Sequence, residues 1–373
     1  MKNIFLIINV ILLNLLIVNT SFQSSIFSET NVDNKGKNLL LSPLSMFQVL
    51  GLTANGALGT TLDEMLLALQ VQSLDNLNGI NLRIIQTLKT FTTVELANGV
   101  MTVFDPIKSF LKICDKYEAP VEKLISVNQV NEWCSEKTHG KITEILDELD
   151  PGTVMLLLNA VYFRGDWEFP FNPDKTFSGE FASSSSSGKL KKVDMMTQVN
   201  EFNYYLDRSV EAIELPYKND SMSALVILPY QGADIDHFVV NNLNDGYVSR
   251  ILDNMTPKMV ELNFPKFEVE FKSKLKDVLK RLGMNKAFEG DADFSGINGF
   301  GGLYIDDVIH KTYLKVDEFG SEAAAVTIVD MRKGPPPKAE VTMDVNRPFI
   351  LILRSKLLPK NNDFLFVGKV ESI

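Results

Sequence analysis

Residues 318–329 read EFGSEAAAVTIV, and the interpretation of the whole chain depends on this stretch. Its three alanines, 323–325, favour a helix, whereas the β-branched residues that follow them favour a strand. Gly320 supplies a flexible point just before the alanines. The sequence therefore predicts a segment that can adopt more than one conformation.

An exposed basic tip follows this stretch. Residues 331–334 read MRKG, and Pro335, Pro336 and Pro337 come directly after them. Three consecutive prolines cannot continue a helix or donate to a sheet, so we expect an extended, exposed segment here. From composition alone, an ordinary flexible loop is the simpler interpretation.

The composition is that of a globular protein with a sizeable core, since 45% of the 373 residues are hydrophobic. The formal net charge of -10 argues against nucleic-acid binding, which needs a basic face to displace counterions. No internal repeat or linker divides the chain. We therefore expect a single domain over residues 21–373.

Residues 1–20 differ from the rest. Lys2 is the only early charge, and the run from Ile4 to Val18 is almost wholly apolar. A charged start followed by a short apolar run is typical of a signal peptide. The run is shorter than the roughly 20 residues of a membrane-spanning helix, although an uncleaved anchor or a buried first helix are alternatives. We therefore expect a secreted, extracellular protein.

The two cysteines, Cys114 and Cys134, fall in the helix-like stretches 109–117 and 128–139. An oxidising environment would permit a disulfide, but two separate thiols are the preferred interpretation. In a secreted chain, Asn219 and Asn254 are glycosylation acceptors, and Pro257 makes the second one weaker.

Local patterns predict helices early in the chain and strands late. Ser42 is expected to cap a helix that has Pro43 in its first turn, and Thr61 with Glu64 forms a capping-box pattern. Residues 154–163 predict a buried strand, and residues 272–282 a helix closed by glycine. This order favours an α+β fold over a regular alternation of strands and helices.

Catalytic chemistry has no positive evidence in the sequence. His139, His237 and His310 do not lie at metal-ligand spacing from one another or from a cysteine. The chain has no nucleophile elbow, phosphate-binding loop or dinucleotide fingerprint. We expect no enzyme activity, metal or cofactor.

A set of motifs in the order of the chain resembles the serpin family of serine protease inhibitors. Beside the stretch at 318–327, the matching segments are residues 38–43, GALGTTLDE at 56–64, LNAVYFRGDW and the FPF after it at 158–171, LGMNKAF and ADFSG at 282–296, NRPF at 346–349 and FLFVGKV at 364–370. The resemblance implies about eight or nine helices around three β-sheets, with an exposed reactive-centre loop at about 318–340. It also implies inhibition by cleavage of the loop and its insertion into the large sheet.

The resemblance assigns roles to individual residues. It implies a hinge that comprises Glu318, Gly320, Ser321, Glu322, Ala323, Ala324, Ala325 and Thr327. It implies a polar cluster where the sheet opens, which comprises Ser42, Ser45, Asn159 and His310, with Trp167 and Lys266 at the top of the sheet. Glu318 resembles a hinge glutamate that pairs with such a lysine and holds the loop out.

Side-chain parity in the hinge is compatible with insertion. Ser321, Ala323, Ala325 and Thr327 share one face of an extended strand, and all four are small. Such a face can enter a sheet without overpacking it. We therefore favour true inhibition over a non-inhibitory binding or chaperone role.

The scissile bond falls near Gly334 and Pro335 by family spacing. A proline just after the bond suits few serine proteases. The bonds after Lys333 and after Arg332 suit a trypsin-like protease, and the bond after Met331 suits an elastase- or chymotrypsin-like one. Residues 70–98 carry few basic side chains, so we expect no heparin site, and we expect a monomer whose partner is the target protease.

Overall fold

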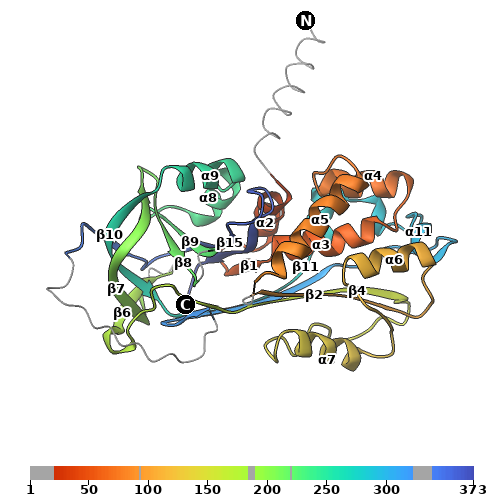
Figure 1. The fold of residues 1–373 in the computed structure, drawn as a ribbon, viewed down its shortest axis with the longest axis horizontal. Helices are drawn as coiled ribbons and strands as arrows, with labels where there is room; N and C mark the ends of the chain where they lie inside the picture. Colours follow the sequence, from red (N-terminus) through yellow and green to blue (C-terminus); the bar gives the residue numbers. More distant parts are fainter. Residues whose placement is uncertain (1–20, 92–93, 184–189, 219–220, 322–337) are drawn as a thin grey trace, which may run out of the picture.

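The structure is a computed structural model that describes residues 21–91, 94–183, 190–218, 221–321 and 338–373. Within these residues it contains ten α-helices and three β-sheets, and six of the ten helices end by Lys137 (Figure 1). The fold class predicted from the sequence, α+β, is confirmed.

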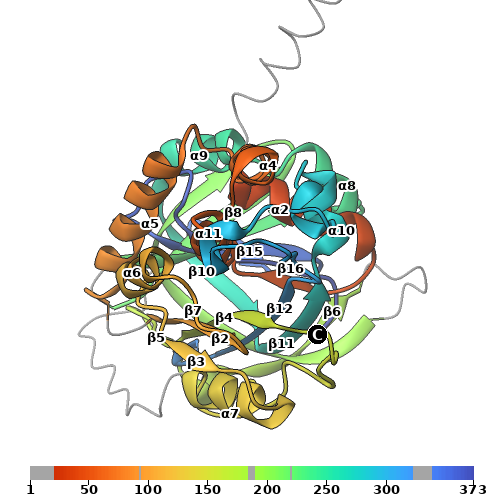
Figure 2. The ribbon, with the colours of Figure 1, turned by 90° about the vertical axis from the view of Figure 1, so that its right-hand side faces the viewer.

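The helices cover the long strands from both sides. Figure 1 shows α3 to α6 above strands β2 and β4, and α7 on the opposite face. Figure 2, turned by 90°, again places α7 outside β2 and β3. The helices are α2 (Phe22–Asp33), α3 (Pro43–Ala54), α4 (Gly59–Ala68), α5 (Leu74–Leu88), α6 (Lys108–Lys116), α7 (Val127–Lys137), α8 (Ile235–Asn241), α9 (Asp245–Asp253), α10 (Lys276–Arg281) and α11 (Ser295–Asn298).

The largest sheet has nine strands and forms one end of the molecule. Its central strands are buried along their whole length, as in β9, β15 and β16. In spatial order the strands are β1 (Leu39–Leu41), β16 (Phe364–Val370), β15 (Phe349–Ser355), β9 (Met222–Pro229), β8 (Val210–Pro216), β7 (Leu190–Leu206), β10 (Thr256–Pro265) and β14 (Val341–Asp344), with β6 (Phe177–Ala182) paired to β7.

Two smaller sheets lie side by side and carry the features that matter for function. One comprises β3 (Val121–Lys123), β2 (Val94–Thr102) and β4 (Met155–Phe163), and the other β11 (Phe267–Lys274), β12 (Ile309–Asp317), β13 (Gly320–Ser321) and β5 (Gly165–Asp166). The chain passes from β4 into β5 through Arg164 alone, and β12 contacts β4. The two sheets are therefore continuous at β4–β5, with β12 next to β4.

The hydrophobic core has two parts. The main cluster lies between the nine-stranded sheet, the N-terminal helices and one face of β4 and β12, and it includes Phe163, Val161 and Leu314. A second cluster lies under α7 and includes Trp133 and Leu158, with Tyr313 packed against it. Alternate residues of β4 and β12 thus face either the main core or α7.

Two local predictions about helix starts are wrong in their side-chain detail. Ser42 is the N-cap residue of α3, but its hydroxyl makes no capping hydrogen bond. Helix α4 begins at Gly59 rather than at Thr61. The Thr61 hydroxyl accepts a hydrogen bond from the Asp293 N–H, and Glu64 accepts from Asn285 and Lys286. Tertiary contacts have therefore taken over the groups that a capping box would use.

The helix expected over residues 272–282 is shorter than its pattern indicates. Residues Lys272 to Lys274 complete β11, and α10 runs only from Lys276 to Arg281. The pairing of Lys272 with Lys311 of β12 explains the difference, because the ladder extends the strand to the start of the helix. Gly283 has a φ of 101°, which fits the glycine stop that the sequence predicts.

No helix in the described ranges has both the length and the apolar character needed to cross a membrane.

Candidate functional site

The described part of the hinge enters the gap between β12 and β5. Gly320 and Ser321 form β13, which pairs antiparallel with Val316 and Asp317 on one side and with Gly165 and Asp166 on the other. The chain thus reverses after β12 and begins a new strand in the middle of the sheet. This strand leads directly into the loop that the sequence identifies.

Gly320 is required at this position by close backbone contact. Its φ is 152°, and a Cβ built on it would lie 1.9 Å from the carbonyl oxygen of Gly165. Any side chain here would push β13 away from β5. The predicted flexible point is therefore also a place where two backbones approach closely.

Ser321, the residue after Gly320 in β13, is fully buried. Its Oγ lies 2.8 Å from the Oη of Tyr217. Tyr217 in turn stacks on Trp167, with ring centroids 4.5 Å apart and ring planes 13° apart. Tyr217 is not predicted from the sequence, because its position directly after β8 gives no signal of this contact.

Trp167 holds the turn between β12 and β13. Its Nε1–H donates to the carbonyl of Asp317 at 3.0 Å, and its backbone N–H donates to the carbonyl of Phe319 at 2.9 Å. The residue is buried. Trp167 therefore contacts the hinge turn directly.

Glu318 lies in this turn and forms an ion pair with Lys266. The Nζ of Lys266 is 3.1 Å from Oε2 of Glu318, and the Thr176 hydroxyl donates to Oε1 at 2.8 Å. Burial alone would raise the pKa of Glu318, but the hydrogen bonds from Thr176, the backbone and Lys266 outweigh burial and hold this pKa below its usual value. Lys266 and Glu318 therefore meet as the resemblance implies.

The polar cluster that the resemblance places where the sheet opens divides into two parts. In the first part, the backbone N–H of Ser42 donates to Nε2 of His310 at 3.0 Å. Burial lowers the pKa of His310 to about 4, because the charged ring has no water around it. His310 is therefore a neutral acceptor at physiological pH.

In the second part of the cluster, Asn159 donates to Oδ1 of Asn98 at 2.8 Å, and Asn98 donates to Oε1 of Gln48 at 3.2 Å. Asn98 and Gln48 are buried, but the sequence analysis did not identify them. The signal that could have identified them is an amide side chain on a buried face, which Asn98 has on a strand and Gln48 has on a helix.

Two hydroxyl groups of the cluster have no hydrogen-bond partner among the described residues. They are the Oγ atoms of Ser42 and Ser45, and both are inaccessible to solvent. A buried hydroxyl without a partner costs free energy. The polar cluster therefore contains two hydroxyl groups that are able to form further hydrogen bonds.

Several predicted site residues lie outside the described residues. These are the hinge residues Glu322, Ala323, Ala324, Ala325 and Thr327, the bond candidates Met331, Arg332, Lys333, Gly334 and Pro335, and the acceptor Asn219. The other acceptor, Asn254, is exposed at the end of α9, where its side chain donates to the carbonyl of Arg250.

The cysteines are two separate buried thiols, as the sequence predicts. Burial is the main cause that raises the pKa of Cys114 to about 12 and that of Cys134 to about 11. Thiols of this kind are poor nucleophiles. Among the residues that the structure describes, no group of three or more His, Cys, Asp or Glu side chains could hold a metal ion.

The site is thus a two-residue strand, β13, that starts between β12 and β5 in an antiparallel sheet and leads towards the segment that resembles a reactive-centre loop. The family model described as serpin (serine protease inhibitor) matches residues 18–373. The chain belongs to the serpin family. The family is one of serine protease inhibitors rather than enzymes.

Individual relatives are similar over most of their length. Intracellular coagulation inhibitor 2 of Tachypleus tridentatus is 32% identical over 91% of this chain and 87% of its own. Iripin-8 of Ixodes ricinus is 30% identical over 91% and 89%.

Solved structures share the fold. The thermophilic serpin tengpin in its native state has a TM-score of 0.85 at 32% identity, with 95% of this chain and 92% of tengpin covered. A thyroxine-binding globulin in complex with thyroxine has a TM-score of 0.83 at 25% identity, with 95% and 98% covered.

Proposed function

We propose that this protein is an irreversible suicide-substrate inhibitor of serine proteases, in which the cleaved loop inserts between β12 and β4. The observation that carries the proposal is the position of β13. Gly320 and Ser321 already pair on both sides within the sheet. Insertion would extend a strand that exists, rather than open a new site.

The register of β13 gives the register of the inserted strand. Ser321 lies opposite Val316, so an antiparallel continuation along β12 places Ala323 opposite Leu314 and Ala325 opposite Thr312. In β12 the buried residues are His310, Thr312, Leu314 and Val316. The small face of the hinge would therefore point into the main core.

The opposite edge gives the same result. Ser321 lies opposite Gly165, so continuation along β5 and β4 places Ala323 opposite Phe163 and Ala325 opposite Val161. Both partners are buried in the main cluster. Large or charged hinge residues would not fit between these side chains.

Thr327 would reach the polar cluster where the sheet is expected to open. The two registers place it opposite His310 on β12 and opposite Asn159 on β4. Its hydroxyl can both donate and accept. This end point supports the proposed role of the cluster, because insertion would bring a further hydroxyl to His310 and Asn159, in a cluster where the hydroxyls of Ser42 and Ser45 lack partners.

The facing edges of β4 and β12 favour insertion. In the described residues, β4 pairs only with β2, and β12 pairs only with β11 and β13. Insertion would then break no β4–β12 backbone ladder, while the new strand forms hydrogen bonds on two sides. Insertion would therefore give a net gain of backbone hydrogen bonds, which supports an irreversible reaction.

The loop is long enough to move a bound protease. Fourteen extended residues, from Ser321 to Gly334, span about 46 Å at roughly 3.3 Å each. The protease would remain attached through its acyl-enzyme bond and move with the strand. A trypsin-like target follows from Arg332 and Lys333, whose cationic side chains fit an acidic specificity pocket.

We further propose that residues 1–20 are a signal peptide, that the protein is a secreted monomer, and that Asn219 and Asn254 carry glycans. The support is the pattern of Lys2 and the apolar run after it, together with the exposure of Asn254. One relative is named an intracellular coagulation inhibitor, so the proposal of secretion rests on this chain's own sequence.

A second candidate is a non-inhibitory binding role. The similarity to a thyroxine-binding globulin favours it, since that protein places ligand binding on the same fold. The small inward face of the hinge argues for inhibition, because a chain that only binds a ligand has no need of a strand that fits the sheet.

Incubation with trypsin tests the proposal. An inhibitor gives a protease complex that survives denaturing gel electrophoresis, and mass spectrometry of the released C-terminal peptide identifies the bond. The expected new N-terminus is Lys333 or Gly334. A cleaved chain without any complex, with trypsin and with elastase- and chymotrypsin-like proteases alike, would support the binding role instead.

A further inference from the structure

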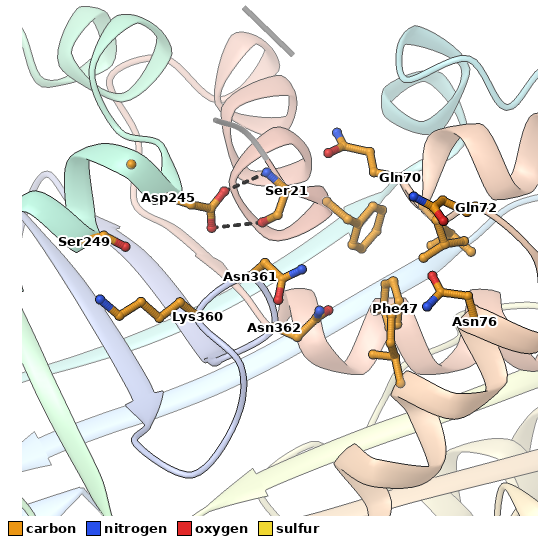
Figure 3. A pocket seen from close by; sticks show the side chains of 15 residues that line it. Ser21, Phe47, Gln70, Gln72, Asn76, Asp245, Ser249, Lys360, Asn361 and Asn362 are labelled. Atoms are coloured by element: carbon orange, nitrogen blue, oxygen red, sulfur yellow. Dashed lines mark hydrogen bonds between the residues drawn. The ribbon is translucent and has the colours of Figure 1, made fainter. Parts of the chain in front are cut away.

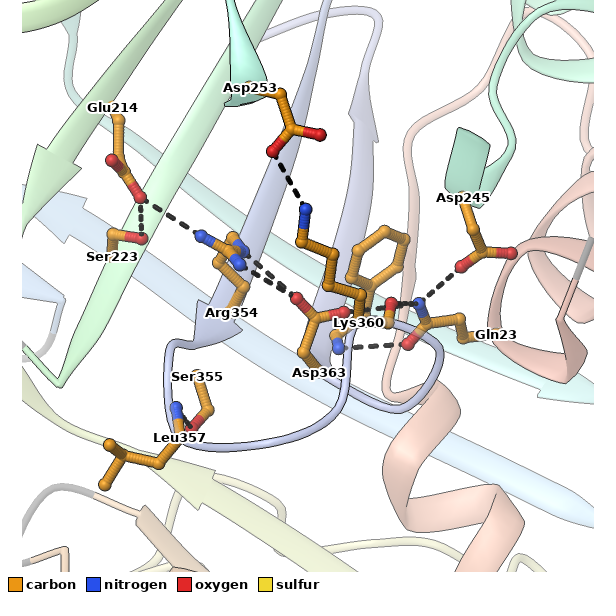
Figure 4. Close-up of polar contacts among 11 residues, drawn as sticks. Gln23, Glu214, Ser223, Asp245, Asp253, Arg354, Ser355, Leu357, Lys360 and Asp363 are labelled. Carbon is orange, nitrogen blue, oxygen red and sulfur yellow. Dashed lines mark hydrogen bonds and ion pairs between the residues drawn. The ribbon is translucent and has the colours of Figure 1, made fainter. Parts of the chain in front are cut away.

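Asp245 binds the start of the described chain through hydrogen bonds. Its two carboxylate oxygens accept hydrogen bonds from the backbone N–H of Ser21 at 2.6 Å, the Ser21 hydroxyl at 2.9 Å, the Ser24 hydroxyl at 2.8 Å and the side-chain amide of Gln23 at 2.6 Å. Figure 3 shows Asp245 facing Ser21, and Figure 4 shows its contact with Gln23. All four donors come from the first four described residues.

Two helix N-termini meet at this carboxylate. Ser21 is the N-cap residue of α2, and Asp245 is the first residue of α9. The positive ends of both helix dipoles favour a negative charge here. Gln23 and Ser24 are buried, whereas Ser21 and Asp245 are half-buried.

The carboxylate has no cationic partner within the described parts of the chain. The nearby Lys360 pairs with Asp253, at the other end of α9, and donates no hydrogen bond to Asp245. Arg354 pairs with Glu214 and Asp363 (Figure 4). The site therefore holds neutral donors around a charge that could accept a cation.

The proposed end of the signal peptide coincides with this site. Removal of residues 1–20 makes Ser21 the first residue, and α2 starts at the next one. No linker separates the junction from the helix. A hollow of about 670 Å³ opens beside it, lined by Ser21, Asp245 and Phe47 among others (Figure 3).

We propose that Asp245 is the binding site for the new N-terminus of the processed chain. A signal peptidase hydrolyses the bond between Thr20 and Ser21 with one water, which gives a carboxylate on Thr20 and an amine on Ser21. The amine takes up a proton and becomes an ammonium group in the place of the present N–H. It then forms an ion pair with Asp245. The carboxylate of Asp245 offsets the positive charge that the ammonium group would otherwise bring to the start of α2.

The inference rests on the proposed secretion, and its test separates the two. The full chain is expressed in secretory eukaryotic cells, and the mass of the secreted protein identifies its first residue. The reactivity of the α-amine with an acylating reagent is then measured against pH. An ordinary α-amine titrates at about pH 7.7 to 8.0, and pairing with Asp245 should shift its reaction profile to higher pH and lower its rate near pH 8 by about three- to tenfold.

Three variants make the result specific. Asp245→Asn should restore ordinary reactivity, and so should insertion of Gly-Ser between Thr20 and Ser21, which moves the amine away without changing the site. Asp253→Asn, on the same helix, should behave like the unaltered protein. If mass measurement shows that all four proteins are cleaved after Thr20, equal reactivity of their α-amines overturns the inference while secretion stands.

A secreted chain that starts elsewhere, or a chain that keeps residues 1–20, also overturns the inference. The trypsin complex is measured on the same samples. Its presence or absence reports on inhibition and is independent of the state of the N-terminus.

Discussion

The hydroxyl of Ser321 and the phenol of Tyr217 are hydrogen-bonded at 2.8 Å, at the point where the hinge enters the sheet. Both residues are buried, and burial raises the pKa of Tyr217 well above its usual value. The bond joins the two-residue strand β13 to the residue that follows β8. It therefore connects the mobile element of the proposed mechanism to the fixed part of the fold.

Tyr217→Phe should weaken this connection with little change in shape. It leaves the Ser321 hydroxyl buried without its partner, and we expect the free energy of unfolding to fall by about 1 to 2 kcal/mol. Denaturant unfolding measures the loss. Tyr230→Phe, at a more exposed tyrosine, is a reference for a tyrosine hydroxyl outside the hinge. Equal, negligible losses in both variants would show that the Ser321 contact contributes nothing.

Gly320→Ala should displace β13 from the sheet. The added Cβ would lie 1.9 Å from the Gly165 oxygen, so the backbone pairing of Gly320 and Ser321 cannot persist. We expect a loss of roughly 1 to 3 kcal/mol and faster proteolysis next to residue 320. Gly36→Ala, where a Cβ meets nothing within 4 Å although φ is also positive, separates backbone strain from the steric contact. An unchanged proteolysis pattern would contradict the close approach.

The ion pair of Glu318 and Lys266 should make stability depend on pH in the acid range. The pKa of Glu318 is lower in the folded state, so its contribution is present above the unfolded value of about 4.3 and is lost as the pH falls through the folded value. Glu318→Gln should therefore be less stable than the unaltered protein at pH 7, and the difference should shrink below about pH 4. Thermal unfolding from pH 7 to pH 3 measures it, with Glu168→Gln, at an exposed carboxylate, as the control. A difference that does not change with pH would exclude the ion pair as its cause.

His310 should destabilise the fold when it becomes protonated. Its folded pKa is about 4, below the unfolded value of about 6.5, so the unfolded state binds the proton first and stability falls as the pH drops from 6.5 towards 4. The expected loss over this range is about 3 kcal/mol. His310→Gln can still accept from the Ser42 N–H and should lose less. His237→Gln, on an exposed histidine, should retain the full loss, and a flat profile in the unaltered protein would show that His310 is not buried as a neutral ring.

The sequence predicts the family, the fold class and the parity of the hinge, because these depend on motifs and on the two-residue period of a strand. It does not predict that Thr61 and Glu64 bind distant backbone groups, or that Lys272 continues a strand, since those outcomes depend on neighbours far along the chain. Tyr217 and Asn98 were missed for the same reason. Their roles come from tertiary contacts that local patterns do not encode.

The parity of the inserted strand also tests the central claim. A protease that cleaves the loop without being trapped should give a chain whose free strand inserts, and the new backbone hydrogen bonds should raise its melting temperature by on the order of 10 °C or more. Ala325→Arg puts a charge on the face that would point into the core, whereas Ala324→Arg puts the same charge on the other face.

The most direct measurement is the melting temperature of the cleaved protein and of these two variants, each compared with its uncleaved form. Insertion in this register should give a large increase for the unaltered protein and for Ala324→Arg, and little or none for Ala325→Arg. No increase in the unaltered protein, or the same increase in both variants, would contradict insertion between β12 and β4 in the register that β13 begins.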